Sequence, residues 1–258
     1  MVNLKNYKVL FRYFGLFLTF TVLFSCTTSK GTVTKVEGKL LKINNSNPEN
    51  QEIENYIKPY RDKIDTDLNA ILAVAPQTLD KSGEWQSTLG NLLADVTLQR
   101  GNLVFNKREN KSIDICLLNH GGIRAIINKG NITARTAFEI MPFENSMIVV
   151  GLKGGQVLEL INYFIVTKKP QPLSGLTFTI DKSKNPKNIL IQGKPIDSDK
   201  VYYVATSDYL SNGGDSMDFF KKGVAFYDLD YKLRNVLIDY FKEVDTIPLV
   251  NDIRVLVE

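Results

Sequence analysis

Apolar residues recur at helical spacing over three long stretches of the chain, which predicts amphipathic helices there. The first stretch covers residues 53–72 and contains Pro59, which we expect to kink or restart the helix. The second covers residues 89–99, and Gly101 behind it is expected to end the helix. The third covers residues 229–241, close to the C-terminus. Each of these helices should pack its apolar face against a common core.

Short apolar runs between these helices predict β-strands. They lie at residues 113–118, 147–150, 176–180, 188–192, 202–206 and 253–257. Two shorter helices are expected at 133–140 and 156–166. Because helices and strands mix without strict βαβ alternation, the predicted fold class is α/β of the α+β type, with a mixed β-sheet core and helices outside it. We expect one domain over residues 51–258.

The N-terminal 26 residues have the pattern of a lipoprotein signal peptide. Three cations and no acid precede an apolar run at 13–24, which is short for a bilayer span and typical of a signal-peptide core. Residues 23–26, Leu-Phe-Ser-Cys, resemble a bacterial lipobox in which Cys26 is lipidated; plain secretion and a short anchor helix are the alternatives. Residues 27–50 are polar, which predicts a flexible tether.

Charge and cysteine content narrow the function classes. The formal net charge is +4 at pH 7, and most of it lies in the N-terminal segment, so the remainder is close to neutral and predicts no nucleic-acid partner. With Cys26 lipidated, Cys116 is the one thiol left, and we expect it to be a small core residue rather than a nucleophile. The absence of an acid directly after Cys26 suggests an outer-membrane lipoprotein that faces the periplasm.

The segment Asn119-His120-Gly121-Gly122-Ile123-Arg124 directly follows the strand predicted at 113–118. Two glycines at a strand exit allow a sharp turn and a close backbone approach to a ligand, because they have no Cβ atom. Arg124 can then present a planar, charged guanidinium group to a phosphate or carboxylate. The alternative is a simple glycine turn with a surface arginine.

Two further turns carry side chains that suit a nucleoside. Phe143, in Pro142-Phe143-Glu144-Asn145, and Tyr209, in the turn at residues 206–215, are aromatic rings able to sandwich a base. Asp215 can accept hydrogen bonds from ribose hydroxyls, and an amide side chain can address the edge of the base. Taken singly, each turn has a structural explanation, since Phe143 could pack into the core and Gly213-Gly214 could form only a tight loop.

Six segments together resemble the C-terminal, substrate-binding domain of the 5′-nucleotidase family, which includes bacterial periplasmic UDP-sugar hydrolases and animal ecto-5′-nucleotidases. They are Leu-Gly-Asn-Leu-Leu-Ala-Asp at 89–95, the NxGGIR turn at 119–124, Gly-Asn-Ile-Thr at 130–133, the PFxN turn at 142–145, Ser-Gly-Leu-Thr-Phe at 174–178 and the NGGD turn at 212–215. Their order and spacing run through nearly the whole predicted domain.

The resemblance implies roles for particular residues. Phe143 and Tyr209 would hold the base between them, with Tyr209 standing where the family usually has Phe; Arg124 would bind the phosphate. Asn119 would contact the base or ribose, and Asp215 the ribose hydroxyls. The implied substrate-binding residues are Asn119, Gly121, Gly122, Arg124, Phe143, Asn145, Tyr209, Gly213, Gly214 and Asp215. The arginine or other polar anchor that the family has before residues 89–95 is missing, and Trp85 in that region is expected to be a core or interface residue.

The resemblance also implies a catalytic half that these residues do not supply. Family members cleave phosphate esters at a two-metal centre built by an N-terminal domain from several His, Asp and Asn ligands, whereas His120 is the single histidine here. We therefore expect no catalytic residue and no cofactor in this chain, with two divalent metals on a partner. The first hypothesis is a nucleotide-binding domain that works with a separate metallophosphoesterase chain. A stand-alone nucleotide- or nucleoside-binding lipoprotein and a scaffold without ligand are the alternatives.

Overall fold

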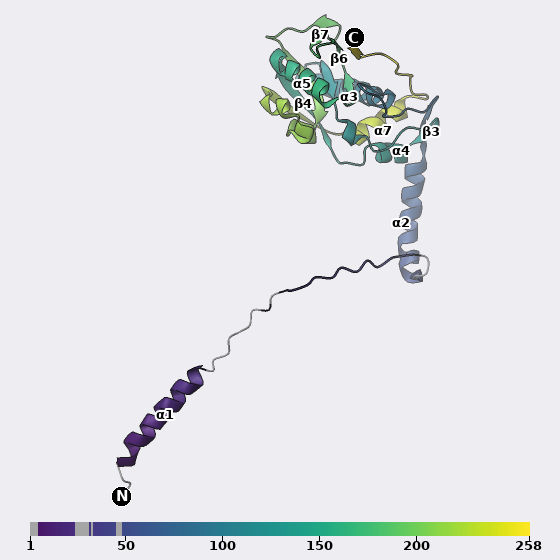
Figure 1. The fold of residues 1–258 in the computed structure, drawn as a ribbon. Helices are drawn as coiled ribbons and strands as arrows, with labels where there is room; N and C mark the ends of the chain where they lie inside the picture. The colour runs from purple at the N-terminus through teal and green to yellow at the C-terminus, as the bar shows by residue number, and fades with distance from the viewer. Residues whose placement is uncertain (1–4, 24–30, 32, 45–47) are drawn as a thin grey trace. The chain divides into compact units, whose positions relative to one another are not determined.

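The computed structural model describes residues 5–23, 31, 33–44 and 48–258 (Figure 1). The chain divides into two units, residues 1–51 and 52–258. The first contains helix α1 (Lys5–Leu23) and a stretch without regular secondary structure at 33–44. Within the described residues, no helix combines the length and the apolar character needed to cross a membrane. The predicted lipidation site Cys26 lies outside the described residues, so the signal peptide and tether stay predictions.

A five-stranded mixed sheet forms the centre of the second unit, with strand order β10-β4-β9-β2-β5. Strands β2 and β9 run parallel, and the other neighbouring pairs are antiparallel. The strands are β2 (Ile115–Leu117), β4 (Ser146–Lys153), β5 (Leu173–Ser174), β9 (Val201–Ser207) and β10 (Ala225–Lys232). Neighbouring strand residues point to opposite faces, so Ile115 and Leu117 enter one core and Cys116 enters the other. Both faces of the sheet are therefore covered.

Helices from distant parts of the chain cover the two faces. Helices α3 (Thr88–Glu109), α4 (Ala134–Ile140) and α7 (Leu233–Glu243) contribute to the core that contains Cys116, and α5 (Gly154–Thr167) contributes to the other core. Ser87 caps α3 by accepting a hydrogen bond from the Gly90 amide at 3.1 Å. The fold class predicted from the sequence is confirmed: a mixed sheet with helices outside it.

Two smaller sheets flank this centre. One has the order β11-β6-β7-β8, and the other pairs β1 with β3 in antiparallel fashion. Their strands are β1 (Ile71–Ala75), β3 (Gly130–Thr133), β6 (Leu176–Ile180), β7 (Pro186–Ile191), β8 (Lys194–Pro195) and β11 (Val255–Val257). The C-terminal strand β11 runs parallel to β6, which brings the end of the chain next to a segment about 75 residues earlier in the sequence.

Helix α2 (Gln51–Asn69) opens the second unit and contains no buried residue. Pro59 lies within the helix rather than at a break. The Arg135 side chain donates hydrogen bonds to Asp65 at 2.7 Å and to Asn69 at 3.0 Å, both near the C-terminal end of α2. These contacts tie the last turn of the helix to the segment around α4.

Three of the predicted boundaries were wrong. Gly101 does not end a helix, because α3 continues to Glu109. A Cβ at Gly101 would come within 2.7 Å of the Met147 sulfur, so this glycine allows close packing instead. Residues 71 and 72 belong to strand β1 rather than to the first helix, and residues 229–232 belong to β10 rather than to α7.

Candidate functional site

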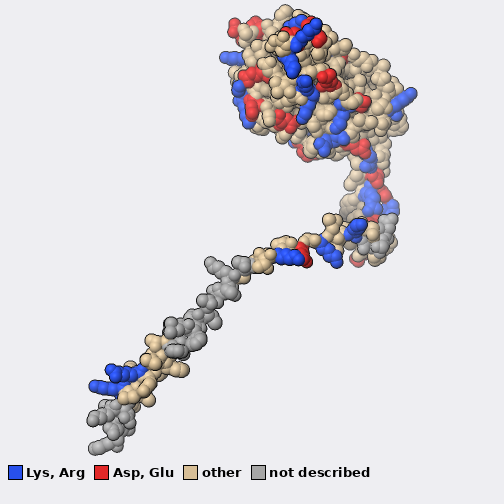
Figure 2. All heavy atoms as spheres, viewed as in Figure 1, with Lys and Arg blue, Asp and Glu red and all other residues tan. Residues whose placement is uncertain are grey.

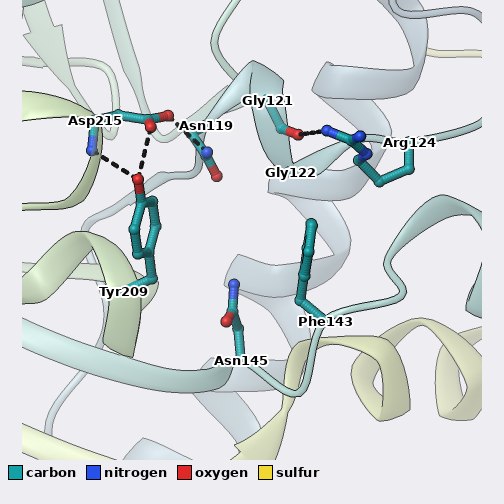
Figure 3. Close-up of a pocket in the computed structure, with 8 residues that line it drawn as sticks. All are labelled: Asn119, Gly121, Gly122, Arg124, Phe143, Asn145, Tyr209 and Asp215. Atoms are coloured by element: carbon teal, nitrogen blue, oxygen red, sulfur yellow. Dashed lines mark hydrogen bonds between the residues drawn. The ribbon is translucent and has the colours of Figure 1, made fainter. Parts of the chain in front are cut away.

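A pocket of about 330 Å³ lies at one edge of the central sheet, next to the C-terminal ends of β2 and β9 and the N-terminal end of β4. Eight of the ten residues predicted to bind substrate line it together (Figure 3). They are Asn119, Gly121, Gly122, Arg124, Phe143, Asn145, Tyr209 and Asp215. The fold therefore assembles three turns that are separated by up to 96 residues along the chain. Their binding role stays a prediction, but their common location is a property of the structure.

The turn after β2 forms the first wall of the pocket. It contains the short 3₁₀-helix η1 (His120–Gly122), preceded by Asn119 in an extended conformation. A Cβ at Gly122 would lie 2.8 Å from the Asn119 side-chain oxygen, so only glycine leaves room for this amide. The Arg124 amide donates to the Ile140 carbonyl at 2.9 Å, and the His120 amide donates to the Gln171 side chain at 2.7 Å. These bonds fix the turn to its neighbours.

The Arg124 guanidinium group is exposed and makes few contacts inside the protein. Its Nη1 atom is 3.4 Å from the Gly121 carbonyl, a long and weak hydrogen bond. Its Cζ atom lies 5.9 Å from the centre of the Phe143 ring, near the outer limit of a cation–π contact. Most of its N–H donors are therefore available to a ligand in the pocket.

Phe143 and Tyr209 stand on opposite sides of the pocket, with Asn145 between them at its floor (Figure 3). Phe143 lies in the turn between α4 and β4, and Tyr209 lies in the short helix α6 (Asp208–Ser211) after β9. The rings are 49% and 47% exposed, respectively, in contrast to the buried phenylalanines of the core. Exposed rings facing a common pocket are suited to stacking on a planar ligand.

Asp215 receives hydrogen bonds from two sides of the pocket. The Asn119 amide donates to one carboxylate oxygen at 2.7 Å, and the Tyr209 hydroxyl donates to the other at 2.9 Å (Figure 3). The Asp215 backbone has φ 51°, in the left-handed region. The Tyr163 hydroxyl donates to the Asp215 backbone carbonyl at 2.9 Å and does not contact the carboxylate. Asn119 thus contacts Asp215 in addition to bordering the pocket.

Gly213 and Gly214 lie in the loop that follows α6 in the sequence, and they are not among the residues that line the pocket. Gly213 adopts a positive φ of 85°, which favours glycine. A Cβ at Gly214 would come within 2.5 Å of the Tyr209 ring, so the ring lies directly against this backbone. Both glycines therefore shape the Tyr209–Asp215 turn.

Cys116 and His120 are the thiol and the imidazole in or next to this turn. Cys116 is fully buried, and burial raises the pKa of its thiol, as expected for a core residue. Burial, assisted by the positive charges of Lys81 and Lys169, lowers the pKa of His120. Among the residues that the structure describes, no three His, Cys, Asp or Glu side chains are grouped to hold a metal ion.

Arg254, close to the C-terminus, forms hydrogen bonds with the segment at residues 89–95. Arg254 is 5% exposed; it donates to Asp95 at 2.6 Å, to the Asn91 carbonyl at 3.2 Å and to the buried Leu173 carbonyl. It also forms an ion pair with Asp252 at 2.8 Å. No local sequence pattern marks this residue, because the arginine expected from the family resemblance lies before position 89 rather than near the C-terminus. Trp85, in that upstream region, is half-buried and packs against the core to which α5 contributes.

Charged side chains of both signs are interspersed over the visible face of the second unit (Figure 2). The pocket itself combines one arginine with one aspartate. This pairing can bind an anionic group at one end and hydroxyl groups at the other, because Arg124 and Asp215 lie at opposite sides of the pocket (Figure 3).

Comparison with known proteins gives one family and several relatives. The family model described as "5′-nucleotidase, C-terminal domain" matches residues 68–222, more than half of the chain. The chain is 26% identical over 235 residues to the trifunctional nucleotide phosphoesterase protein of Bacillus subtilis, covering 83% of this chain and 16% of that protein. It is 25% identical over 242 residues to 5′-nucleotidase of Mus musculus, covering 84% and 42%.

Solved structures show the same fold. A 5′-nucleotidase precursor from Thermus thermophilus aligns with a TM-score of 0.67 and 25% identity, covering 81% of this chain and 44% of that one. NAD nucleotidase from Haemophilus influenzae aligns with a TM-score of 0.61 and 17% identity, covering 81% and 42%, which shows similarity of fold alone. The chain spans less than half of the length of each of these relatives.

Proposed function

Since the chain belongs to the family of 5′-nucleotidase C-terminal domains, we propose that it binds a nucleotide and presents it to a separate metallophosphoesterase chain that cleaves the phosphate ester. The observation that supports this proposal is the pocket itself. Eight predicted substrate-binding residues, from three distant turns, border one cavity of about 330 Å³, within the range of small-molecule sites.

The pocket offers a complementary group to each part of a nucleotide. Phe143 and Tyr209 stand on opposite sides of the pocket, and in the proposed complex the base stacks between them. Asp215 offers carboxylate lone pairs to ribose hydroxyls. Arg124, whose donors are largely free of protein partners, offers a charged, bidentate contact to the phosphate.

Hydrolysis requires groups that the described residues do not bring together. A two-metal centre stabilises the attacking and leaving oxygens of a phosphate ester. The described part of the chain has no group of three His, Cys, Asp or Glu side chains placed to hold a metal ion, and His120 is its single histidine. In the proposed pair, two divalent metals and the activated water come from the partner chain, while this chain fixes the base, sugar and phosphate.

The proposed cellular setting is the bacterial envelope. With Cys26 lipidated after signal-peptide cleavage, residues 27–50 would tether the nucleotide-binding unit to the membrane, and the lack of an acid at residues 27–29 supports an outer-membrane location facing the periplasm. Labelling of expressing cells with a fatty-acid probe tests this point. Incorporation that disappears in Cys26→Ser supports the anchor, and incorporation that persists in Cys26→Ser contradicts it.

Reconstitution tests the division of labour. A candidate metallophosphoesterase chain, for example one encoded by an adjacent reading frame, is mixed with this chain, and phosphate release from AMP and UMP is measured with Mn²⁺ and with EDTA. We expect metal-dependent release that is stronger in the mixture than with the phosphoesterase alone. A mixture of the phosphoesterase with Phe143→Ala serves as the matched control. Equal activity with and without this chain contradicts the split-enzyme proposal.

A stand-alone binding protein is the second candidate function. The observation that favours it is that every lining residue of the pocket comes from the unit at residues 52–258. Isothermal titration with AMP, UMP and adenosine measures this directly. Submicromolar affinity in the isolated chain, together with no stimulation of any phosphoesterase, favours this candidate over the split enzyme.

A further inference from the structure

The Tyr209 hydroxyl exchanges two hydrogen bonds with a single residue. It donates its proton to one Asp215 carboxylate oxygen at 2.9 Å and accepts the Asp215 backbone N–H at 3.2 Å. A phenol has one proton to donate and lone pairs to accept with, so both capacities are directed at Asp215. The aromatic wall of the pocket and its carboxylate are therefore connected directly (Figure 3).

The other oxygen of the same carboxylate is also held. The Asn119 amide donates to it at 2.7 Å, so the two oxygens accept one intramolecular hydrogen bond each. Each oxygen of a carboxylate can accept about two hydrogen bonds, which leaves one acceptor position per oxygen. With its plane fixed from both sides, Asp215 presents these two positions in a constant direction.

The backbone of Asp215 adopts a conformation that is uncommon for residues other than glycine. Its φ of 51° lies in a region that aspartate visits infrequently, and the next residue, Ser216, also has a positive φ of 62°. Without the Tyr209 hydroxyl, the Asp215 N–H would lose a protein acceptor, and the carboxylate would be held by the Asn119 amide alone. A phenylalanine ring at this position can stack on a base but cannot hold the carboxylate.

We infer that Tyr209 is a positioning residue for sugar recognition: its hydroxyl fixes the Asp215 carboxylate so that the pocket selects nucleotides with intact ribose hydroxyls. This inference rests on the proposed function, since it assigns the sugar-reading part of the same pocket. It adds a second role to a ring that would otherwise only stack. Base stacking and ribose recognition are coupled through one side chain.

The test compares AMP with 2′,3′-dideoxy-AMP, which has the same base and phosphate but neither ribose hydroxyl. Isothermal titration gives both dissociation constants for the full chain, and their ratio measures ribose recognition. We expect the wild-type protein to bind AMP at least about tenfold more tightly, because hydrogen bonds to a charged acceptor are among the stronger ones. Tyr209→Phe should weaken AMP binding about three- to tenfold and leave the dideoxy affinity close to wild type, so that the ratio falls.

Two further variants separate positioning from a general effect on the loop. Tyr163→Phe removes a hydroxyl that binds the Asp215 carbonyl rather than its carboxylate, so it should keep the wild-type ratio. Asp215→Ala removes the carboxylate, and adding Tyr209→Phe to it should cause no further change in the ratio if Tyr209 acts through Asp215.

Each outcome decides the question. A wild-type protein that binds neither AMP nor UMP overturns the proposed function and this role with it; if it binds only UMP, the same comparison is made between UMP and its 2′,3′-dideoxy form. A protein that binds AMP and dideoxy-AMP equally keeps the proposed function but overturns ribose recognition by Asp215. A Tyr209→Phe variant that keeps the wild-type ratio, or that weakens both ligands by the same factor, shows that the hydroxyl does not position the carboxylate.

Discussion

Replacing Arg124 by Met should separate ligand binding from protein stability. The substitution keeps much of the aliphatic length and removes the charged donors. Inside the protein, Arg124 has one long hydrogen bond of 3.4 Å and a cation–π contact at 5.9 Å from the Phe143 ring centre. Exposed contacts of this kind contribute about 0.5–1 kcal/mol at most, so the melting temperature should change by no more than about 4 °C in a unit of this size.

The effect on binding should be larger and specific to the phosphate. A charge-assisted hydrogen bond contributes about 1.5–3 kcal/mol, and solvent exposure of Arg124 places its contribution near the lower end. About 1.5 kcal/mol corresponds to roughly a tenfold loss of affinity for AMP. Adenosine has no phosphate, so its affinity should stay close to wild type. The ratio of the two dissociation constants is therefore the quantity to measure, by isothermal titration at low and moderate salt.

Lys81 provides a matched control for charge near the same turn. Its ammonium group donates to the Ile123 carbonyl at 2.8 Å, and it does not line the pocket. Lys81→Met should leave the ratio of AMP to adenosine affinity close to wild type. If Arg124→Met weakens adenosine as much as AMP, or if Lys81→Met changes the ratio as strongly as Arg124→Met, then Arg124 is not the phosphate contact.

Three further predictions concern stacking, the C-terminal arginine and acid sensitivity. Phe143→Ala should weaken AMP and adenosine alike by about 1–3 kcal/mol in titrations, because the half-exposed ring offers stacking area to the base; unchanged affinities would show that the ring does not stack. Arg254→Ala should lower the free energy of unfolding in urea by about 1–3 kcal/mol, because it removes a buried donor from two backbone carbonyls and leaves Asp95 with the Ser174 hydroxyl, and Arg254→Lys should recover part of this loss; a decrease below about 1 kcal/mol would contradict the assigned role. The hydrogen bond from Arg254 lowers the pKa of Asp252, so the stabilisation by this pair is complete above the ordinary aspartate pKa of about 3.9 and is lost as the pH falls through the lower folded-state value. Asp252→Asn should therefore reduce the difference in stability between pH 5 and pH 3, and an unchanged difference would contradict the linkage.

The sequence predicted the pocket well because its components are local motifs. Each turn carries its own signal, such as the glycines after the strand at 113–118 or the aromatic residue after Pro142. The resemblance of six ordered segments then indicated that the turns meet in space. What it could not show is how Asn119, Tyr209 and Asp215 bond to one another, because this depends on side-chain directions of residues up to 96 positions apart in the sequence.

The errors in the predicted elements have physical causes. Glycine is typical of a helix C-terminus, but at position 101 the lack of a Cβ atom instead allows Met147 and Ile113 to pack against the helix backbone. Residues 229–232 continue the apolar pattern of α7, yet pairing of β10 with β4 draws them into the sheet, where Lys232 is opposite Ser146. Tertiary packing overrides local preference in both places.

Arg254 was invisible to sequence reasoning for a different reason. Its importance comes from partners 159 to 163 residues earlier in the chain, Asp95 and the Asn91 carbonyl. No local pattern around residues 252–254 indicates that the arginine becomes buried. Only the parallel pairing of β11 with β6 brings it there.

The burial of Cys116 makes it an internal reporter of how often the centre of the sheet opens. It is the single cysteine of residues 52–258, it is fully buried in β2, and its pKa is raised, so a thiol reagent can modify it only when this strand becomes exposed. The same strand leads directly into the Asn119–Arg124 turn. The rate of thiol modification, measured with and without AMP, would therefore read out how strongly an occupied pocket suppresses local unfolding of the strand beneath it.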